Sequence, residues 1–319
     1  MNEQPGRPFL QEGPPRTPPQ ELLADFRPAD AGLKWPWKRA PSHDFTIQYQ
    51  ALGNAMCNPD STSSAQTEIE TTLIICSPNP QAALTHIAGL TSVAGFGLAP
   101  RASLAIQDFY LDTPDAELHA AKWALRVRYV RENAWVTVKG PSTPRQGSLQ
   151  RAEVEAEWSP DALHAVVEQL LGQGFRLEAD AMVFHPSRPL QTLKSIGLVV
   201  VQHRETLRRI REIFSPGEAQ MRAAAELDLD SVIYHLPRHD IHHHEVEIEA
   251  RSSDYADLVQ AVVEGLSAIL PGTLRRWHYS KLATGKAVEK LLESRGQEEL
   301  VKNGRLTPEA YDRIEALLA

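Results

Sequence analysis

Cysteine is almost absent from this chain of 319 residues, which contains only Cys57 and Cys76. Two such residues provide neither a disulfide framework nor the clustered ligand spacing of a zinc site. We therefore expect reduced thiols and no disulfide bond, and a small disulfide-stabilised secreted domain is excluded.

Long apolar runs and an excess of positive charge are also missing. No segment approaches the roughly 20 apolar residues that span a bilayer, and the N-terminus is polar and Pro-rich where a signal peptide would be apolar. The 33 Lys and Arg residues are outnumbered by 41 Asp and Glu residues. Broad binding to nucleic acid needs clustered basic residues. We expect a cytoplasmic protein that binds neither membranes nor nucleic acid.

Composition places the chain among globular proteins, with 42% hydrophobic and 23% charged residues. Residues 1–65 contain repeated prolines and no sustained periodicity, which predicts a flexible N-terminal arm. Residues 66–285 are expected to form one domain, followed by a helical extension over 286–319. The last helix of this extension either packs back on the domain or projects from it.

Alternation of apolar and charged residues predicts eight strands in the central domain. They are expected near residues 66–76, 104–112, 122–131, 134–140, 150–158, 198–211, 222–236 and 242–251. Helical periodicity interrupts them after Ser77, from Ser159 and after Asp254, where Ser and Asp are favoured N-caps. Shorter helices are expected near 190–196, 287–292 and 308–318.

Six of these strands each carry one charged face and one apolar face. The charged sides contain Glu68 and Glu70; Arg126 and Arg128; Thr137 and Lys139; Glu153, Glu155 and Glu157; Asp228 and Asp230; Glu245, Glu247 and Glu249. One interpretation is the solvated face of an ordinary antiparallel sheet. However, some strands carry only acids on the charged face and others only bases. This separation favours an α+β fold built on a closed, eight-stranded antiparallel β-barrel, with the charges inside and flanking helices outside.

A lumen of carboxylates and basic side chains is stable only when ions and water fill it. Carboxylate oxygens suit Mg²⁺ or Mn²⁺, and guanidinium groups grip phosphate oxygens in pairs. A triphosphate together with divalent metal ions fits such a lumen.

At these residues the sequence resembles the CYTH superfamily, which includes class IV adenylyl cyclases, thiamine triphosphatases and inorganic triphosphatases. Its opening Glu-x-Glu-x-Lys signature corresponds to Glu68-Ile69-Glu70-Thr71-Thr72. The most specific match is Ala124-Leu125-Arg126-Val127-Arg128. The other matching segments are Gln107 to Asp115, Trp135 to Pro141, Arg151 to Glu155, Gln202-His203-Arg204, Asp228-Leu229-Asp230, Glu247-Ile248-Glu249 and Ser280-Lys281.

The resemblance implies a triphosphate tunnel and assigns residues to it. The metal ligands would be Glu68, Glu70, Asp228, Asp230, Glu247 and Glu249, and the phosphate contacts Arg126, Arg128, Lys139, Arg204 and Lys281. Glu153 or Glu155 would orient the attacking water, so the catalytic residues would be Glu153, Glu155 and Arg126. Mg²⁺ or Mn²⁺ would be the cofactor, and a small triphosphate the substrate.

Two positions depart from the family pattern. Thr72 stands where the family has a lysine, and His203 is a titratable replacement for a permanent cation. Lys122 or Arg208 could compensate. Three functions follow: hydrolysis of inorganic tripolyphosphate or thiamine triphosphate, a class IV adenylyl cyclase, or a non-catalytic module that binds triphosphate or polyphosphate. A homodimer is compatible with all three.

A run of three histidines, His242 to His244, is interpreted as an exposed strand start rather than a metal site. Neighbouring residues of a strand point to opposite faces, so only His242 and His244 could share one ion. His235 and His239 are likewise expected to be surface residues.

Overall fold

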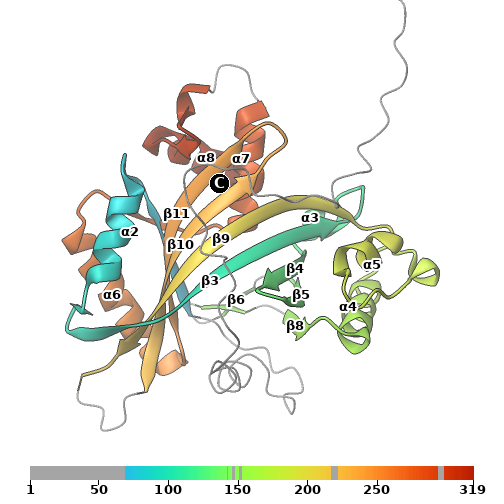
Figure 1. Cartoon of the computed structure of the whole chain (residues 1–319), viewed down its shortest axis with the longest axis horizontal. Helices are drawn as coiled ribbons and strands as arrows, with labels where there is room; N and C mark the ends of the chain where they lie inside the picture. Colours follow the sequence, from blue (N-terminus) through green and yellow to red (C-terminus); the bar gives the residue numbers. More distant parts are fainter. Residues whose placement is uncertain (1–68, 142, 146–147, 151–152, 217–221, 294–297) are drawn as a thin grey trace, which may run out of the picture. The chain divides into compact units, whose positions relative to one another are not determined.

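The computed structural model describes residues 69–141, 143–145, 148–150, 153–216, 222–293 and 298–319 (Figure 1). All of them belong to one compact unit, Cys57–Ala319. The predicted N-terminal arm over residues 1–65 and the proposed ligand Glu68 lie outside the described residues.

One sheet contains most of the strands, and its hydrogen-bonded order is β12-β1-β11-β10-β9-β3-β4-β5-β8. Its strands are β1 (Glu70–Ile75), β2 (Ser92–Val93), β3 (Phe96–Asp112), β4 (Ala124–Val130), β5 (Asn133–Lys139), β8 (Glu153–Glu157), β9 (Val199–Phe214), β10 (Ala223–His235), β11 (Asp240–Ala250), β12 (Leu274–Trp277), β13 (Val301–Lys302) and β14 (Arg305–Leu306). β6 (Thr143–Arg145) and β7 (Ser148–Gln150) form a separate pair. All eight predicted strands are present, and their pairings with one another are antiparallel.

The predicted α+β class is confirmed, but the sheet is not a closed barrel. Among the described residues, no ladder joins β8 at one edge to β1 or β12 at the other. β12 occupies the second edge of β1, pairing from Thr72↔Trp277 to Ile75↔Leu274. β12 and β8 are therefore the two edges of an open sheet in the described part of the chain.

The helices are α2 (Pro80–Gly89), α3 (Glu117–Ala120), α4 (Pro160–Gly172), α5 (Pro189–Ser195), α6 (Ala256–Ile269), α7 (Lys281–Glu293) and α8 (Pro308–Leu318), with short 3-10 turns η1 (Ala179–Ala181), η2 (Ser253–Tyr255) and η3 (Glu298–Leu300). The N-cap expected at Ser159 is formed, and its hydroxyl accepts from the Ala162 amide at 3.1 Å. The other two caps differ, because Asn79 caps α2 and Asp254 lies within η2 before α6.

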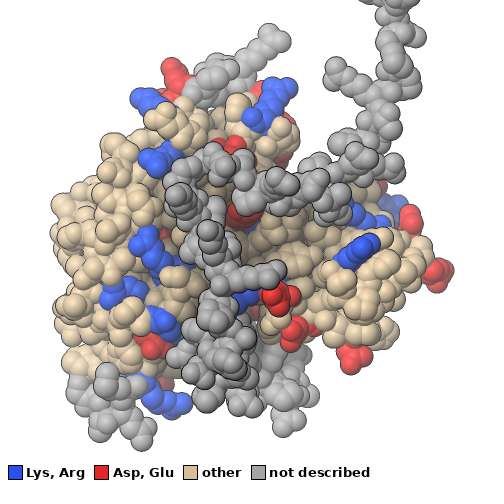
Figure 2. All heavy atoms as spheres, in the orientation of Figure 1, with Lys and Arg blue, Asp and Glu red and all other residues tan. Residues whose placement is uncertain are grey.

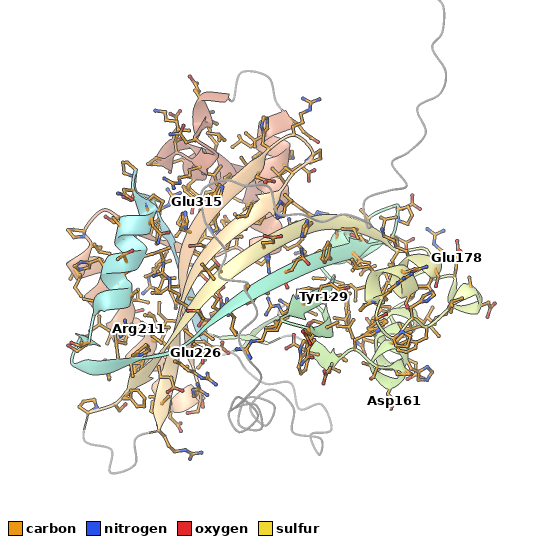
Figure 3. The ribbon with its side chains drawn as sticks, in the orientation of Figure 1. Tyr129, Asp161, Glu178, Arg211, Glu226 and Glu315 are labelled. Atoms are coloured by element: carbon orange, nitrogen blue, oxygen red, sulfur yellow. The ribbon has the colours of Figure 1, made fainter. Side chains whose placement is uncertain are left out.

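Two helix pairs cover the apolar side of the sheet, here called the outer face (Figure 1). α2 and α6 pack against the apolar residues of β1, β10 and β11, with Leu84 and Val262 fully buried. α4 and α5 pack against β4 and β5, around Leu125 and Val136. Arg211 of β9 donates to the carbonyls of Ala88 and Leu90 and so ties the end of α2 to the sheet (Figure 3).

α7 and α8 pack on the opposite side, here called the inner face, which carries the charged residues. Their apolar cluster includes Ile74, Val232, Tyr234 and Ile241, which share a strand face with the charged side chains of β1, β10 and β11. The C-terminal helix therefore packs back on the sheet. It covers one end of the inner face and brings Lys281, at the start of α7, onto it.

Gly285 lets α7 approach the sheet closely. A Cβ at this position would lie 2.4 Å from Gln202 Nε2 and 2.7 Å from Tyr234 Cε1. We expect Gly285→Ala to lower the free energy of unfolding by about 1–3 kcal/mol, because overpacking displaces the helix. Gly89→Ala is the matched control, since a Cβ there would have no atom within 4 Å and alanine is the better helix former. Denaturant unfolding measures both, and equal stability of the two variants would contradict the close packing.

Candidate functional site

The inner face carries two groups of buried charges that meet along β9. Arg204 and Arg208 belong to different groups and lie on the same face of this strand, four residues or about 13 Å apart. β3 supplies the partners of Arg204, and β10 and β11 supply the acids that pair with Arg208.

The first group, the arginine cluster, surrounds Asp108 of β3, which is 1% exposed. Arg128 donates to both carboxylate oxygens, at 2.7 and 3.0 Å, and Arg204 donates to Oδ2 at 2.7 Å. Arg126 Nε lies 3.9 Å from Asp108 Oδ1, and Arg204 also donates to the Tyr110 hydroxyl at 3.0 Å. Three guanidinium groups thus converge on one carboxylate.

Glu155 of β8 joins the arginine cluster from its far side. Its Oε2 accepts from Arg126 at 2.9 Å and from Thr137 at 2.6 Å. Burial acts to raise the pKa values of Asp108 and Glu155, but the guanidinium groups outweigh it and lower both, that of Asp108 well below its usual range. Both carboxylates are therefore ionised at neutral pH, and three arginines against two acids leave a net positive charge.

The second group, the carboxylate cluster, consists of Asp228 and Asp230 of β10 with Glu245 and Glu247 of β11. Arg208 and Lys281 lie between these acids. Arg208 pairs with Asp228, with Asp230 Oδ2 at 2.7 Å and with Glu247 Oε2 at 2.5 Å. Lys281 Nζ pairs with Glu245, with Asp230 Oδ2 at 3.1 Å and with Glu247 Oε1 at 2.5 Å.

With all four acids ionised, two bases would leave the carboxylate cluster with surplus negative charge. Burial acts to raise the pKa of Asp230, but Arg208 and Lys281 lower it to about 2. Asp228 differs, because burial and neighbouring carboxylates outweigh Arg208 and raise its pKa to about 7. The pKa of Glu247 is raised well above its usual range by burial and by Glu70 and Asp230, against the effect of Arg208.

The C-terminal helix supports the carboxylate cluster through His243, which is fully buried. His243 Nε2 lies 2.8 Å from Glu245 Oε2, and its Nδ1 lies 2.9 Å from the Tyr311 hydroxyl of α8. Burial, with a contribution from Lys281, lowers the pKa of His243 to about 3. The neutral ring can donate to Glu245 from Nε2 and accept the Tyr311 proton at Nδ1.

The donor set of the carboxylate cluster fits a divalent cation. Asp230, Glu245 and Glu247 each offer one oxygen within 4.8 Å of the others, and Asp228 Oδ1 is buried with no hydrogen-bond partner among the residues that the structure describes. Oxygen ligands of this kind suit Mg²⁺ and Mn²⁺. A cation would also neutralise the surplus charge that raises the pKa values of Asp228 and Glu247.

The structure brings most of the predicted site residues onto the inner face, but not all into these clusters. Arg126, Arg128, Arg204 and Glu155 lie in the arginine cluster, and Asp228, Asp230, Glu247 and Lys281 in the carboxylate cluster. Glu70 and Glu249 are exposed and lie opposite each other in the β1–β11 ladder, and Glu70 acts on the carboxylate cluster by helping to raise the pKa of Glu247. Lys139 is the last residue of β5, and its positive charge contributes to lowering the pKa of Glu155. The side chain of Glu153 lies outside the described residues.

Asp108 and Arg208 were not assigned a definite role from the sequence, and Glu245 was placed on the charged face of its strand but not among the metal ligands. Asp108 lies within the matching segment Gln107 to Asp115, and Arg208 follows Arg204 and Thr206 at the strand period of two. That period is the signal that could have placed both on the inner face. Lys122, the other candidate for compensation, is exposed in a turn with φ +61°.

The interpretation of His203 as a cation of the tunnel is wrong. Its ring lies on the outer face, stacked on Phe109 at 4.3 Å, whereas Gln202 and Arg204 lie on the inner face. The expected exposed start at His242 to His244 is also wrong, because His243 and His244 are 0% and 7% exposed. Tyr311 of α8 contacts His243 on the inner face, whereas His244 lies on the outer face with its ring beside the Ser231 hydroxyl.

The fold and the two clusters define an α+β protein whose antiparallel sheet presents buried carboxylates and guanidinium groups on one face. The chain belongs to the CYTH family, because the CYTH domain model matches residues 83–270, more than half of its length. No curated protein sequence matches it significantly.

Three solved structures illustrate what the chain is similar to. A putative adenylyl cyclase from Hippeastrum, described as having a dominant triphosphatase activity, is 17% identical, covers 69% of this chain and 95% of its own, and has a TM-score of 0.44. A putative adenylate cyclase from Bacillus halodurans is 17% identical over 69% and 97%, with a TM-score of 0.40. A Pyrococcus horikoshii protein is 18% identical over 72% and 99%, with a TM-score of 0.39.

The described helices are all too short or too polar to cross a membrane.

On the face shown in Figure 2, basic and acidic side chains of the described residues are interspersed.

The raised pKa of Asp228 predicts a pH-dependent stability. Because its pKa of about 7 in the folded state exceeds that of an ordinary carboxyl, its contribution to stability is present near pH 4 and is lost as pH rises to about 7. Asp228→Asn cannot lose a proton there. In metal-free protein, we expect the stability of this variant relative to the wild type to increase steadily from pH 4 to pH 7, measured by chemical denaturation.

Comparison with the wild type cancels the contributions of the histidines, which titrate in both proteins. A stability difference that stays constant over this pH range would show that Asp228 is already ionised at pH 4.

Proposed function

We propose that this protein is a divalent-metal-dependent triphosphatase that acts on a small linear triphosphate, inorganic tripolyphosphate or thiamine triphosphate. The observation that carries the proposal is the adjacency of a carboxylate cluster with surplus negative charge and an arginine cluster with surplus positive charge. A metal–triphosphate complex has matching parts, since its cation suits the first cluster and its phosphates suit the second.

The arginine cluster would bind the phosphate oxygens. Arg126, Arg128 and Arg204 are held by Asp108, so their guanidinium groups are oriented before the substrate arrives. Fixed positive charge of this kind stabilises the negative charge that develops during phosphoryl transfer, which is usually the largest contribution to catalysis. Lys139, at the end of β5, is proposed to contact the same chain of phosphates.

The carboxylate cluster would hold the metal through Asp228, Asp230, Glu245 and Glu247. A divalent cation held there would supply positive charge that offsets the negative charge of the triphosphate. In the structure, Arg208 and Lys281 offset part of the charge of these carboxylates. We infer that both turn toward the phosphates when a cation takes their place, so that neither group of charges is left buried without a partner.

Thr72 does not leave the carboxylate cluster without a cation. It lies on β1 opposite Glu247 and Trp277, and its hydroxyl donates to Glu70 at 3.2 Å. Arg208 and Lys281 both reach Glu247 from other elements. They are the residues we propose to supply the charge that the family lysine provides.

Glu155 is the proposed residue that orients the attacking water. It is an ionised acceptor beside Arg126, and Thr137 fixes one of its oxygens. An acceptor in this position can align a water molecule against a phosphorus atom held by the arginines. No covalent nucleophile is required. Glu153 lies two residues earlier on the same strand, opposite Lys139 in the β5–β8 ladder, and is the alternative.

The first experiment measures phosphate release from tripolyphosphate, thiamine triphosphate and ATP with Mg²⁺ or Mn²⁺, while cyclic AMP is also monitored. We expect release from one small triphosphate, and its loss when EDTA removes the metal. Cyclic AMP from ATP would instead indicate a class IV adenylyl cyclase. No turnover, combined with a rise in melting temperature on adding triphosphate, would indicate a non-catalytic binding module.

Arg126→Ala tests the arginine cluster. We expect kcat to fall about 10²- to 10³-fold, because one fixed charge at the transferring phosphoryl group is lost. The fold should survive, since Arg128 and Arg204 still neutralise Asp108. Arg209→Ala is the matched control, because Arg209 lies on the outer face of β9 beside Arg208 and makes no contact with either cluster in the described structure. Wild-type turnover in Arg126→Ala, measured at saturating substrate, would contradict the assignment.

A further inference from the structure

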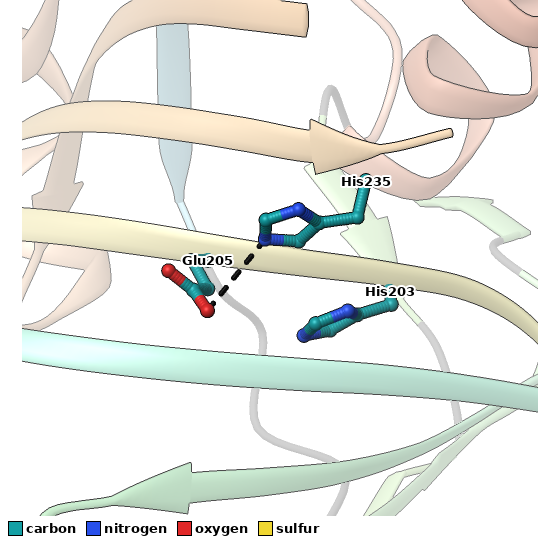
Figure 4. A group of neighbouring side chains, drawn as sticks. All are labelled: His203, Glu205 and His235. Atoms are coloured by element: carbon teal, nitrogen blue, oxygen red, sulfur yellow. Dashed lines mark ion pairs between the residues drawn. The ribbon is translucent and has the colours of Figure 1, made fainter. Parts of the chain in front are cut away.

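The outer face of β9 and β10 carries a group of side chains that the proposed hydrolysis does not use. His203 and Glu205 of β9 lie beside His235 of β10 (Figure 4). His203 and His235 are directly opposite each other in the ladder, and Glu205 lies two residues further along β9. Alternation along both strands directs all three side chains away from the carboxylate and arginine clusters.

The three side chains are spaced closely enough to share one ion. One donor atom from each lies within 4.8 Å of the other two, and His235 Nε2 is 3.6 Å from Glu205 Oε1. Ligand atoms of a tetrahedral zinc site lie about 3.4 Å apart, given bond lengths near 2.0–2.1 Å. The imidazole rings are stacked with centroids 4.3 Å apart and an angle of 24°. A modest rotation of the rings would therefore direct both Nε2 atoms to one point.

The Nε2 atoms of both histidines are buried and have no hydrogen-bond partner among the described residues. A buried polar atom without a hydrogen bond costs free energy, and His235 Nε2 has the Glu205 carboxylate as an ion-pair partner at 3.6 Å, beyond hydrogen-bond distance. A metal ion bound to both nitrogens would satisfy them together.

Neighbouring residues already hold the three side chains in place. Asp240 Oδ1 lies 2.9 Å from His235 Nδ1, the carboxylate–histidine arrangement that orients an imidazole toward a metal. Gln107 donates to Glu205 at 3.4 Å, and Phe109 stacks on His203 with parallel rings. Each proposed ligand thus has a supporting contact from β3 or β11.

We propose that His203, Glu205 and His235 form a zinc site, with Nε2 of each histidine and one carboxylate oxygen as ligands. Imidazole nitrogen favours Zn²⁺ over Mg²⁺, which prefers oxygen ligands. The fourth position is open to water or to an added ligand. This site is separate from the metal proposed at the carboxylate cluster, because the two sets of ligands lie on opposite faces of β9 and β10.

Zinc at this position would link β9 and β10, two strands that contribute residues to the clusters. The inner face of β9 holds Arg204 and Arg208, and that of β10 holds Asp228 and Asp230. A cross-link between His203 and His235 would fix the spacing of these strands without touching the substrate. The site is accordingly expected to stabilise the protein against unfolding.

The test is a titration of the full, metal-free chain with Zn²⁺ in excess Mg²⁺, which saturates oxygen-rich sites. We expect one equivalent to bind by calorimetry, and Co²⁺ in its place to give the visible absorption of a nitrogen-ligated tetrahedral site. The double variant His203→Gln/His235→Gln should lose this binding. Asp240→Asn should weaken it about 10- to 100-fold, because the orienting carboxylate is removed.

Two controls separate this site from other binding. His164→Gln removes an exposed histidine that pairs with Glu168 at 3.1 Å on α4, and it should leave the titration unchanged. Glu247→Gln should also retain the zinc equivalent while losing triphosphate turnover, which distinguishes failure of this inference from failure of the proposed hydrolysis. No bound zinc in the wild type, or unaltered binding in the folded double variant, would overturn the proposal.

Discussion

Compensation of buried charge is the constraint on which the rest of this structure depends. Asp230 is completely buried in the middle of β10, and it is ionised only because Arg208 and Lys281 reach it from β9 and α7. Each of these bases is shared among several acids. The position of α7, the register of β9 against β10 and the ionisation of the carboxylates are therefore coupled, since a shift of any one leaves a buried charge without a partner.

The alternation of apolar and charged residues was sufficient to predict eight of the strands and to group the acids and arginines of β4, β10 and β11 on one face. It could not predict where the sheet ends. β3 begins at Phe96, earlier than expected, because Gly97 and the register shift near Pro100 interrupt the alternation. Closure failed as a prediction because alternation shows which face of a strand is polar but not whether the two edge strands, here β8 and β12, come together.

The candidate site was predictable in type but not in detail. The resemblance grouped Arg126, Arg204 and Lys281 in one site, and all three lie on the inner face. The first two belong to short strand motifs, which fix the face to which a side chain points. It did not indicate that Arg208 would reach three carboxylates, since the reach of a long side chain depends on its neighbours across the sheet. The burial of His243 depends on α8, nearly 70 residues later in the sequence, and no local pattern records that contact.

Strand alternation also limits how this sequence can change during evolution. β9 carries arginines for one face and the histidine–glutamate pair for the other, at successive positions. Substitution at one position can alter a single function, whereas insertion or deletion of one residue within the strand would exchange the two faces and disrupt both at once. Among descendants of this sequence, β9 is therefore expected to tolerate replacements but to keep its length, with gaps confined to the loops beyond Val199 and Phe214.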